Sequence, residues 1–278
     1  MLGSLLITLR EGLEAALIIG IILAYLAKTG NRQGFKPIWI GAGLGVLASL
    51  VIGVIIYFTA SELQGSAEQI FEGTVMFIAV GVLTWMIFWM RKQAVNIKAH
   101  LQAQIQSALT SGSSLALVVM AFLAVVREGI ETVLFLFATT RTAESPLTFT
   151  LGGLLGLLAA VLIGYAIYKG TSRLNLSLFF NVTSVILILF AAGLLAHGIH
   201  EFNEAGLIPP VIEHVWDTNG LIQEKSTFGS FLTALSGYNA NPSLTEIISY
   251  LLFLIATLSG YFFFMKTRPK TRLEHQFS

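Results

Sequence analysis

The sequence LREGLE at residues 9–14 lies inside the apolar run 4–27, and it recurs as VREGIE at residues 126–131 inside the apolar run 114–138. An α-helix needs roughly 20 residues to cross about 30 Å of hydrocarbon, and both runs are longer than that. Neither run shows the alternation of a β-strand, so we interpret both as membrane helices. The repeated motif therefore places three ionisable side chains inside the membrane twice.

The composition excludes most soluble functions. Hydrophobic residues make up 55% of the 278 positions and charged residues 11%, and the mean hydropathy is +0.79. Ordinary soluble domains contain about 25% charged residues. The formal net charge of +1 gives no basic surface for a nucleic acid. The chain has no cysteine, so a bound metal must be held by carboxylate, imidazole or hydroxyl groups, and we expect no organic cofactor.

Five further apolar runs are long enough to span a membrane, so the predicted fold is an all-α polytopic membrane protein with seven transmembrane helices. The first helix is expected to stay, because it has neither a basic n-region nor a cleavage pattern. Most of the 16 Lys and Arg residues fall on one side of the predicted spans, which puts the N-terminus outside and the C-terminus in the cytoplasm. The five further runs are 36–59, 69–90, 147–169, 177–199 and 245–265.

The chain is predicted to contain two three-helix repeats followed by a seventh helix, within a single permease domain. Glycines also recur at the start of the second helix of each unit, at 41–45 and 152–156. Because each unit has an odd number of spans, the second unit must be inverted, as in many secondary transporters. The predicted parts are repeat one 1–90, an amphipathic cytoplasmic connector 91–113, repeat two 114–199, an outer loop 200–244 with a short helix within 221–235, and the seventh helix with its tail 245–278.

The ionisable residues of the two motifs should face one another inside the bundle. Each would cost roughly 2.5–3.5 kcal/mol at the centre of a lipid-facing helix. In each motif the two glutamates are three residues apart on one helical face, and the arginine is four residues before the second glutamate. These residues are Arg10, Glu11, Glu14, Arg127, Glu128 and Glu131.

Four glutamates against two arginines leave two surplus negative charges in a low-dielectric interior. Bound protons or a bound cation would balance them. A carboxylate site without sulfur favours hard ions such as Ca²⁺, Mg²⁺, Mn²⁺ or iron, above all Fe³⁺. The alternative is that each arginine merely joins helices by pairing with a glutamate. That alternative explains one pair in each motif but not the second glutamate.

A second group of potential metal ligands lies at the outer end of the predicted sixth span. His197, His200, Glu201 and Glu204 share one helical stripe, and Glu68 and Glu72 at the start of the third span could join them. We expect either an outer access site for a metal or ordinary interfacial side chains. The tryptophans of the third span, Trp85 and Trp89, are predicted to be membrane-facing or interfacial packing residues.

The motifs REGLE and REGIE resemble those of the oxidase-dependent iron permease family, which includes fungal high-affinity iron permeases and bacterial Efe-type permeases. The resemblance covers essentially the whole chain and includes the sequences LTWM at 83–86, HE at 200–201 and GYNANPS at 237–243.

The resemblance implies import of iron, typically ferric, across the bacterial inner membrane, with iron as the cargo. Glu11, Glu14, Glu128 and Glu131 look like its ligands, and Arg10 and Arg127 look like charge-balancing residues. It also implies separate periplasmic partners that oxidise or deliver iron, besides the surrounding membrane lipid.

Two alternatives stay open on the residues alone. The first is a transporter for another hard or divalent cation, such as Mn²⁺ or Pb²⁺, or a proton-coupled carrier. The second is an intramembrane metal-dependent hydrolase, which needs a histidine at the depth of the carboxylates. No predicted span places a histidine beside Glu11 or Glu128, so we do not expect an enzyme.

Overall fold

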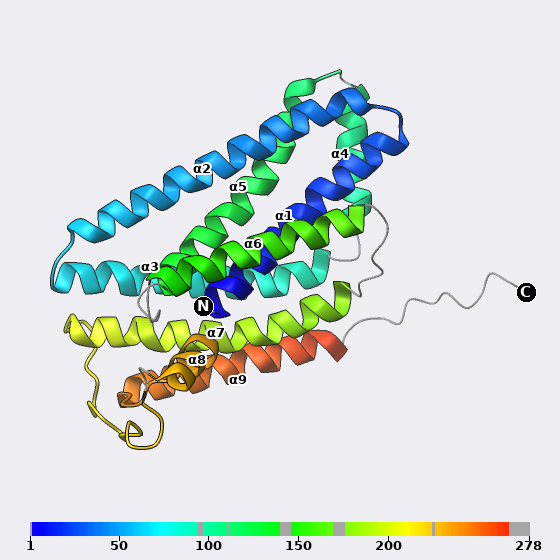
Figure 1. Cartoon of the computed structure of the whole chain (residues 1–278). Helices are drawn as coiled ribbons and strands as arrows, with labels where there is room; N and C mark the ends of the chain where they lie inside the picture. The colour runs from blue at the N-terminus through cyan, green and yellow to red at the C-terminus, as the bar shows by residue number, and fades with distance from the viewer. Residues whose placement is uncertain are drawn as a thin grey trace, which may run out of the picture.

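The computed structural model describes residues 2–93, 97–110, 112–139, 146–168, 176–223 and 226–266, and this part of the chain is helical with connecting loops. The helices run along one another in a layered bundle (Figure 1). They are α1 (Leu2–Lys28), the 3₁₀ turn η1 (Arg32–Gly34), α2 (Phe35–Glu62), α3 (Ser66–Gln93), α4 (Ile97–Thr110), α5 (Ser114–Thr139), α6 (Pro146–Tyr168), α7 (Leu176–Glu204), α8 (Thr227–Ser236) and α9 (Leu244–Lys266).

The all-α prediction is confirmed for the described residues. Each predicted span lies within one long helix, except that residue 169 of the fifth span lies outside the described residues. In the described part of the chain, five helices are long and apolar enough to cross a membrane, namely α2, α3, α6, α7 and α9. The helices α1 and α5 are similarly long, with 27 and 26 residues, but each carries the three ionisable residues of a motif. The predicted count of seven spans therefore depends on these two helices.

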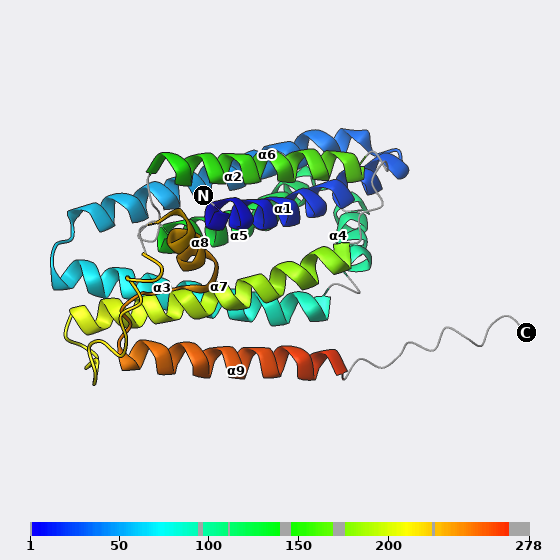
Figure 2. The ribbon, with the colours of Figure 1, turned by 60° about the horizontal axis from the view of Figure 1, so that its bottom comes forward.

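Figure 2 shows the long helices in layers. α2 and α6 lie in one outer layer, where α2 packs on α5 and α6 packs on α1. α1 and α5 contact each other in the next layer, followed by α3 with α7, and α9 packs on α7. The large apolar side chains of α2 and α6 are widely exposed, as expected of a surface that faces lipid. The two motif helices thus lie in a middle layer, shielded from both sides.

The short helices α4 and α8 lie towards opposite ends of the bundle (Figure 2). Both were predicted as helices in the connector and in the outer segment, and both predictions are confirmed. Leu101 and Ile105 of α4 are buried, Ile105 in the apolar cluster around Leu26 of α1. The helix α8 packs against α7 closely enough that the backbones of Gly237 and Gly193 touch.

The helix α7 continues beyond the predicted end of its span at residue 199, to Glu204. It ends where Gly206 adopts a φ of +75°. The Gly206 amide donates to the Asn203 carbonyl at 3.0 Å and the Leu207 amide donates to the Phe202 carbonyl at 2.9 Å, which is the Schellman pattern of a helix end. The segment 200–204 is therefore helical and does not belong to the outer loop.

Glycines allow α2 to approach α5 and α6 to approach α1. A Cβ atom on Gly45 would lie 2.9 Å from Cβ of Val125 and 3.0 Å from the amide nitrogen of Val126. A Cβ atom on Gly156 would lie 2.9 Å from the amide nitrogen of Leu9 and would collide with the Leu5 carbonyl oxygen. Small residues at such contacts are typical of membrane helix pairs. These contacts set the positions of both motifs.

We expect Gly156→Val to destabilise the protein by roughly 1–3 kcal/mol or more, because the added side chain meets backbone atoms of α1. Gly43→Val is the matched control, since a Cβ atom on Gly43 meets nothing within 4 Å. Thermal unfolding in detergent micelles measures both variants. Equal melting temperatures for the two would contradict the close packing of α6 on α1.

Candidate metal centre

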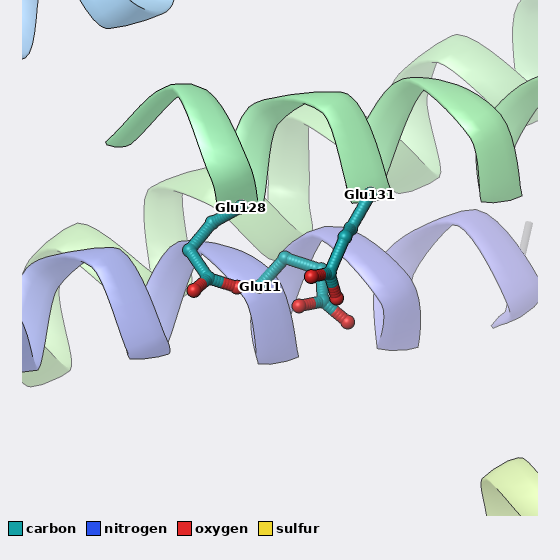
Figure 3. Close-up of side chains that lie close together, drawn as sticks. All are labelled: Glu11, Glu128 and Glu131. Atoms are coloured by element: carbon teal, nitrogen blue, oxygen red, sulfur yellow. The ribbon is translucent and has the colours of Figure 1, made fainter. Parts of the chain in front are cut away.

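Carboxylates from α1 and α5 meet in the middle layer of the bundle. Glu11, Glu128 and Glu131 each offer an oxygen atom, and these atoms all lie within 4.8 Å of one another. Figure 3 shows Glu128 and Glu131 reaching from α5 towards Glu11 on α1. The exposed fractions are 1% for Glu11 and 4% for each of the other two, so the group is closed to bulk solvent. We call these three residues the carboxylate cluster.

The local sequence explains this arrangement. Glu128 and Glu131 are three residues apart on a regular helix, so they project from one face of α5. The residue between them that faces away is Gly129, where an added Cβ atom would meet the Ser49 side chain of α2. Gly129 therefore allows α2 to pack on one face of α5, while the two glutamates point from another face towards α1.

The arginine of the first motif is locked in place. The Arg10 guanidinium donates to Glu11 at 2.6 Å and to the sulfur of Met86 at 3.1 Å, and its Nη2 lies 3.0 Å from Oε1 of Glu14. The Arg10 side chain is only 2% exposed. Arg10 therefore joins both glutamates of its own motif to α3; helical spacing had predicted its pairing with Glu14 but not the contact with Met86.

The arginine of the second motif has a different environment. The Arg127 Nε donates to Oε1 of Glu131 at 3.1 Å and lies 3.7 Å from Oε1 of Glu128. The centre of its guanidinium lies 4.2 Å from the ring centroid of Trp89 and 5.5 Å from that of Trp85. The Arg127 side chain is 30% exposed. The two REGxE motifs thus place their arginines in different surroundings.

Three buried oxygen atoms of the carboxylate cluster have no hydrogen-bond donor among the described residues. They are Oε2 of Glu11, Oε2 of Glu128 and Oε2 of Glu131. An unpaired buried carboxylate is strongly unfavourable unless a proton or a cation satisfies it. The donor set is oxygen only, which suits a hard cation. The three glutamates are therefore candidate ligands of a metal ion.

Glu14, the fourth predicted ligand, is not in the group within 4.8 Å. It is buried, with 6% exposed, and its Oε1 faces the Arg10 guanidinium. The structure therefore brings three of the four predicted ligands together, and the role of Glu14 as a ligand stays a prediction.

The predicted outer access site is held in a hydrogen-bond network. His200 contacts Glu246 through Nδ1 at 3.1 Å and Glu204 through Nε2 at 3.3 Å. The rings of His197 and His200 are 6.3 Å apart. Glu68 and Glu201 are partly exposed and Glu72 is buried. Within the described ranges, only the carboxylate cluster brings three ligand atoms so close together, and metal access at the outer residues stays a prediction.

The sequence reasoning missed Glu246, which is only 3% exposed. Its carboxylate accepts from the Asn239 side chain at 2.8 Å and from the Ser243 amide at 3.3 Å, while its own amide donates to Oγ of Ser243. This is a capping box at the start of α9, and the pattern S-x-x-E at 243–246 could have predicted it. Glu246 joins the start of α9 to His200 at the end of α7.

Comparisons with known proteins agree on one family. The chain matches the sequence model of the iron permease FTR1 family over residues 1–268. It is 39% identical over 259 residues to a ferrous iron permease EfeU of Yersinia pestis, covering 92% of each chain. It is 41% identical over 258 residues to a ferrous iron permease EfeU of Escherichia coli O6:H1, covering 92% of this chain and 93% of that protein. No solved structure matches the chain.

We expect Arg10→Gln to lower the free energy of unfolding by about 3–5 kcal/mol, because it leaves the buried Glu11 and Glu14 without their positively charged partner. Arg127→Gln should cost only about 1–2 kcal/mol, because that side chain is partly exposed and makes one hydrogen bond. Thermal unfolding of the two purified variants checks the difference. Losses of equal size would show that the two arginines are held equally.

Proposed function

Because the chain belongs to the iron permease FTR1 family, and is a multi-pass membrane permease and not an enzyme, we propose that iron crosses the membrane through the carboxylate cluster. The observation that carries this proposal is the meeting of three buried carboxylates, each with an oxygen atom lacking a donor among the described residues. Iron is the cargo in this account, and Glu11, Glu128 and Glu131 are its ligands.

The depth of the cluster supports a transport role. Glu11 stands about 14 Å along α1 from its first residue, at a rise of about 1.5 Å per residue. This is close to half of the roughly 30 Å hydrocarbon thickness. Ionisable residues at such depth usually mark the path of an ion. We therefore include α1 and α5 among the membrane spans, which gives seven.

Corresponding contacts in the two halves support an inverted repeat. The close contacts of Gly45 in α2 include the amide nitrogen of Val126 in α5, and those of Gly156 in α6 include the amide nitrogen of Leu9 in α1. Val126 and Leu9 occupy the same place, directly before the arginine of each motif. The second helix of each half thus packs on the first helix of the other half. The proposed orientation, with the N-terminus outside, follows from the basic residues.

The middle glycines of the motifs repeat this relation. An added Cβ atom on Gly12 would lie 3.0 Å from Cβ of Ala160 in α6, and one on Gly129 would lie 2.6 Å from Cβ of Ser49 in α2. Ala160 stands four residues after Gly156, which contacts α1. Ser49 stands four residues after Gly45, which contacts α5. A transporter built this way has its substrate site where the halves meet, and the carboxylate cluster lies there.

Charge balance favours a divalent ion in the cluster. With both arginines charged, the four ionised glutamates leave two negative charges, which one Fe²⁺ neutralises. A ferric ion would leave one positive charge in excess unless an arginine left the bundle. The relatives are named ferrous iron permeases. We therefore propose ferrous iron as the bound form, whereas the family resemblance had suggested ferric iron as the cargo.

Two further expectations belong to this proposal. Other divalent cations such as Mn²⁺ should compete for the cluster, because three carboxylates do not discriminate strongly among hard ions. Separate periplasmic proteins that oxidise or deliver iron are proposed as partners on the family resemblance. A proton-coupled carrier is the remaining alternative, since protons could also balance the surplus charge.

Removal of a cluster glutamate should abolish iron uptake. We expect Glu11→Ala, Glu128→Ala and Glu131→Ala to lower the initial rate of radioactive iron uptake into proteoliposomes by at least roughly tenfold, since even the supporting partners of metal ligands have effects of that size. Glu62→Ala is the matched control, because Glu62 is exposed at the end of α2. Uptake at the control rate by all three variants would overturn the proposed path.

The oxidation state can be tested with the same vesicles. Uptake of iron kept ferrous by ascorbate should exceed uptake of ferric citrate by at least about tenfold, because one excess buried charge is strongly unfavourable. Excess Mn²⁺ should slow the ferrous uptake. Equal or faster uptake of ferric iron, unchanged by ascorbate, would contradict the divalent assignment and favour the ferric one.

A further inference from the structure

The two motif arginines differ in their contacts, and two tryptophans lie beside the second one. Trp85 is 55% exposed, consistent with a membrane-facing residue, and its ring also lies under the Arg127 guanidinium. We propose that Arg127 is a displaceable counter-charge, which leaves Glu131 when a metal ion binds, and that Trp85 and Trp89 are positioning residues that hold its guanidinium in both states. This inference rests on the proposed function, since it describes how the same carboxylate cluster accepts its ion.

The first step is the contrast between Arg10 and Arg127. Arg10 contacts Glu11, Glu14 and Met86, and almost none of its side chain is exposed. Arg127 makes one carboxylate hydrogen bond, to Glu131, and its buried Nη2 atom has no hydrogen-bond partner within the described ranges. Displacing Arg10 would break contacts to two helices. Displacing Arg127 from its carboxylate breaks one hydrogen bond.

The second step is the indole pair. Trp85 and Trp89 are four residues apart on α3, and their rings are stacked with centroids 5.8 Å apart and an interplanar angle of 29°. The Arg127 guanidinium lies over both rings. A cation over an indole face is stabilised without a counter-ion, and more so where water is scarce. The indole pair therefore offers the arginine a place at membrane depth that is independent of Glu131.

The third step is competition for the same carboxylates. Arg127 Nε lies 3.1 Å from Glu131 and 3.7 Å from Glu128, which are two of the three cluster residues. A metal ion bound there would repel a guanidinium at that distance strongly in a low dielectric. Arg127 must therefore break its hydrogen bond to Glu131 when the ion binds and form it again when the ion leaves. An indole pair that holds the cation during this exchange lowers the free energy of the metal-bound state.

The test compares substitutions of Trp89 with a substitution of Trp39, a tryptophan on another helix. Trp89→Leu should raise the half-saturating iron concentration for uptake into proteoliposomes about tenfold and change the maximal rate less than about twofold, because the arginine loses its alternative position and competes with iron. Trp89→Phe keeps a ring face and should raise the half-saturating concentration by only about twofold to threefold. Trp39→Leu is the control, since Trp39 on α2 is 61% exposed, and should leave both values unchanged.

Arg127→Gln should act in the opposite direction. Without its counter-charge the cluster should bind iron more tightly and release it more slowly, so both the half-saturating concentration and the maximal rate should fall by about threefold or more. In the Arg127→Gln background, Trp89→Leu should have no further effect on the half-saturating concentration. This double-mutant cycle separates a positioning role from a packing role, which would be additive.

The outcomes separate this inference from the proposed function. If the cluster glutamates are needed for uptake but Trp89→Leu behaves like Trp39→Leu, the displaceable arginine is wrong and the iron path stands. If the glutamates are not needed, the proposed function is wrong, and this inference with it. Should Trp89→Leu not fold, Trp89→Phe decides, because it must then raise the half-saturating concentration about twofold to threefold. An unchanged value for Trp89→Phe would overturn the inference.

Discussion

The electrostatic free energy of four glutamates buried with two arginines is the constraint on which the rest of this structure depends. No lipid-facing helix could carry these charges, so α1 and α5 must face each other and must be covered on both sides. The layers of α2 with α6 and of α3 with α7 provide that cover. The glycine contacts are a consequence, because the covering helices must approach the motif helices closely to exclude lipid. The same surplus of negative charge is the reason why we propose a cation site at the centre.

The fold was largely predictable from the sequence, because hydrophobic runs of membrane length leave few alternatives. The site was predictable in part. Helical spacing places Glu128 and Glu131 on one face, and the repeat predicts that Glu11 meets them, as the structure shows. The position of Glu14 was harder to predict from the sequence. Helical spacing allows its carboxylate to face either the carboxylate cluster or Arg10, and only the packing of α1 decides between them.

Other features depended on tertiary contacts that no local pattern contains. The motifs LREGLE and VREGIE predict equal environments for Arg10 and Arg127, whereas one arginine packs against Met86 and the other against two indoles. Met86, Trp85 and Trp89 all lie on α3, so both arginines pack against one helix and have different neighbours on it. This difference between Arg10 and Arg127 is the basis of the proposal that Arg127 is the displaceable one.

The central claim is that iron binds to the glutamates of α1 and α5, and X-ray absorption spectroscopy of the purified, iron-loaded protein tests it most directly. Iron at these glutamates should show a coordination shell of oxygen atoms without the multiple-scattering signal of imidazole, and Glu131→Ala should lose the bound iron. A spectrum with imidazole ligands that persists in Glu131→Ala would place the iron at histidines such as His200 and would contradict the account.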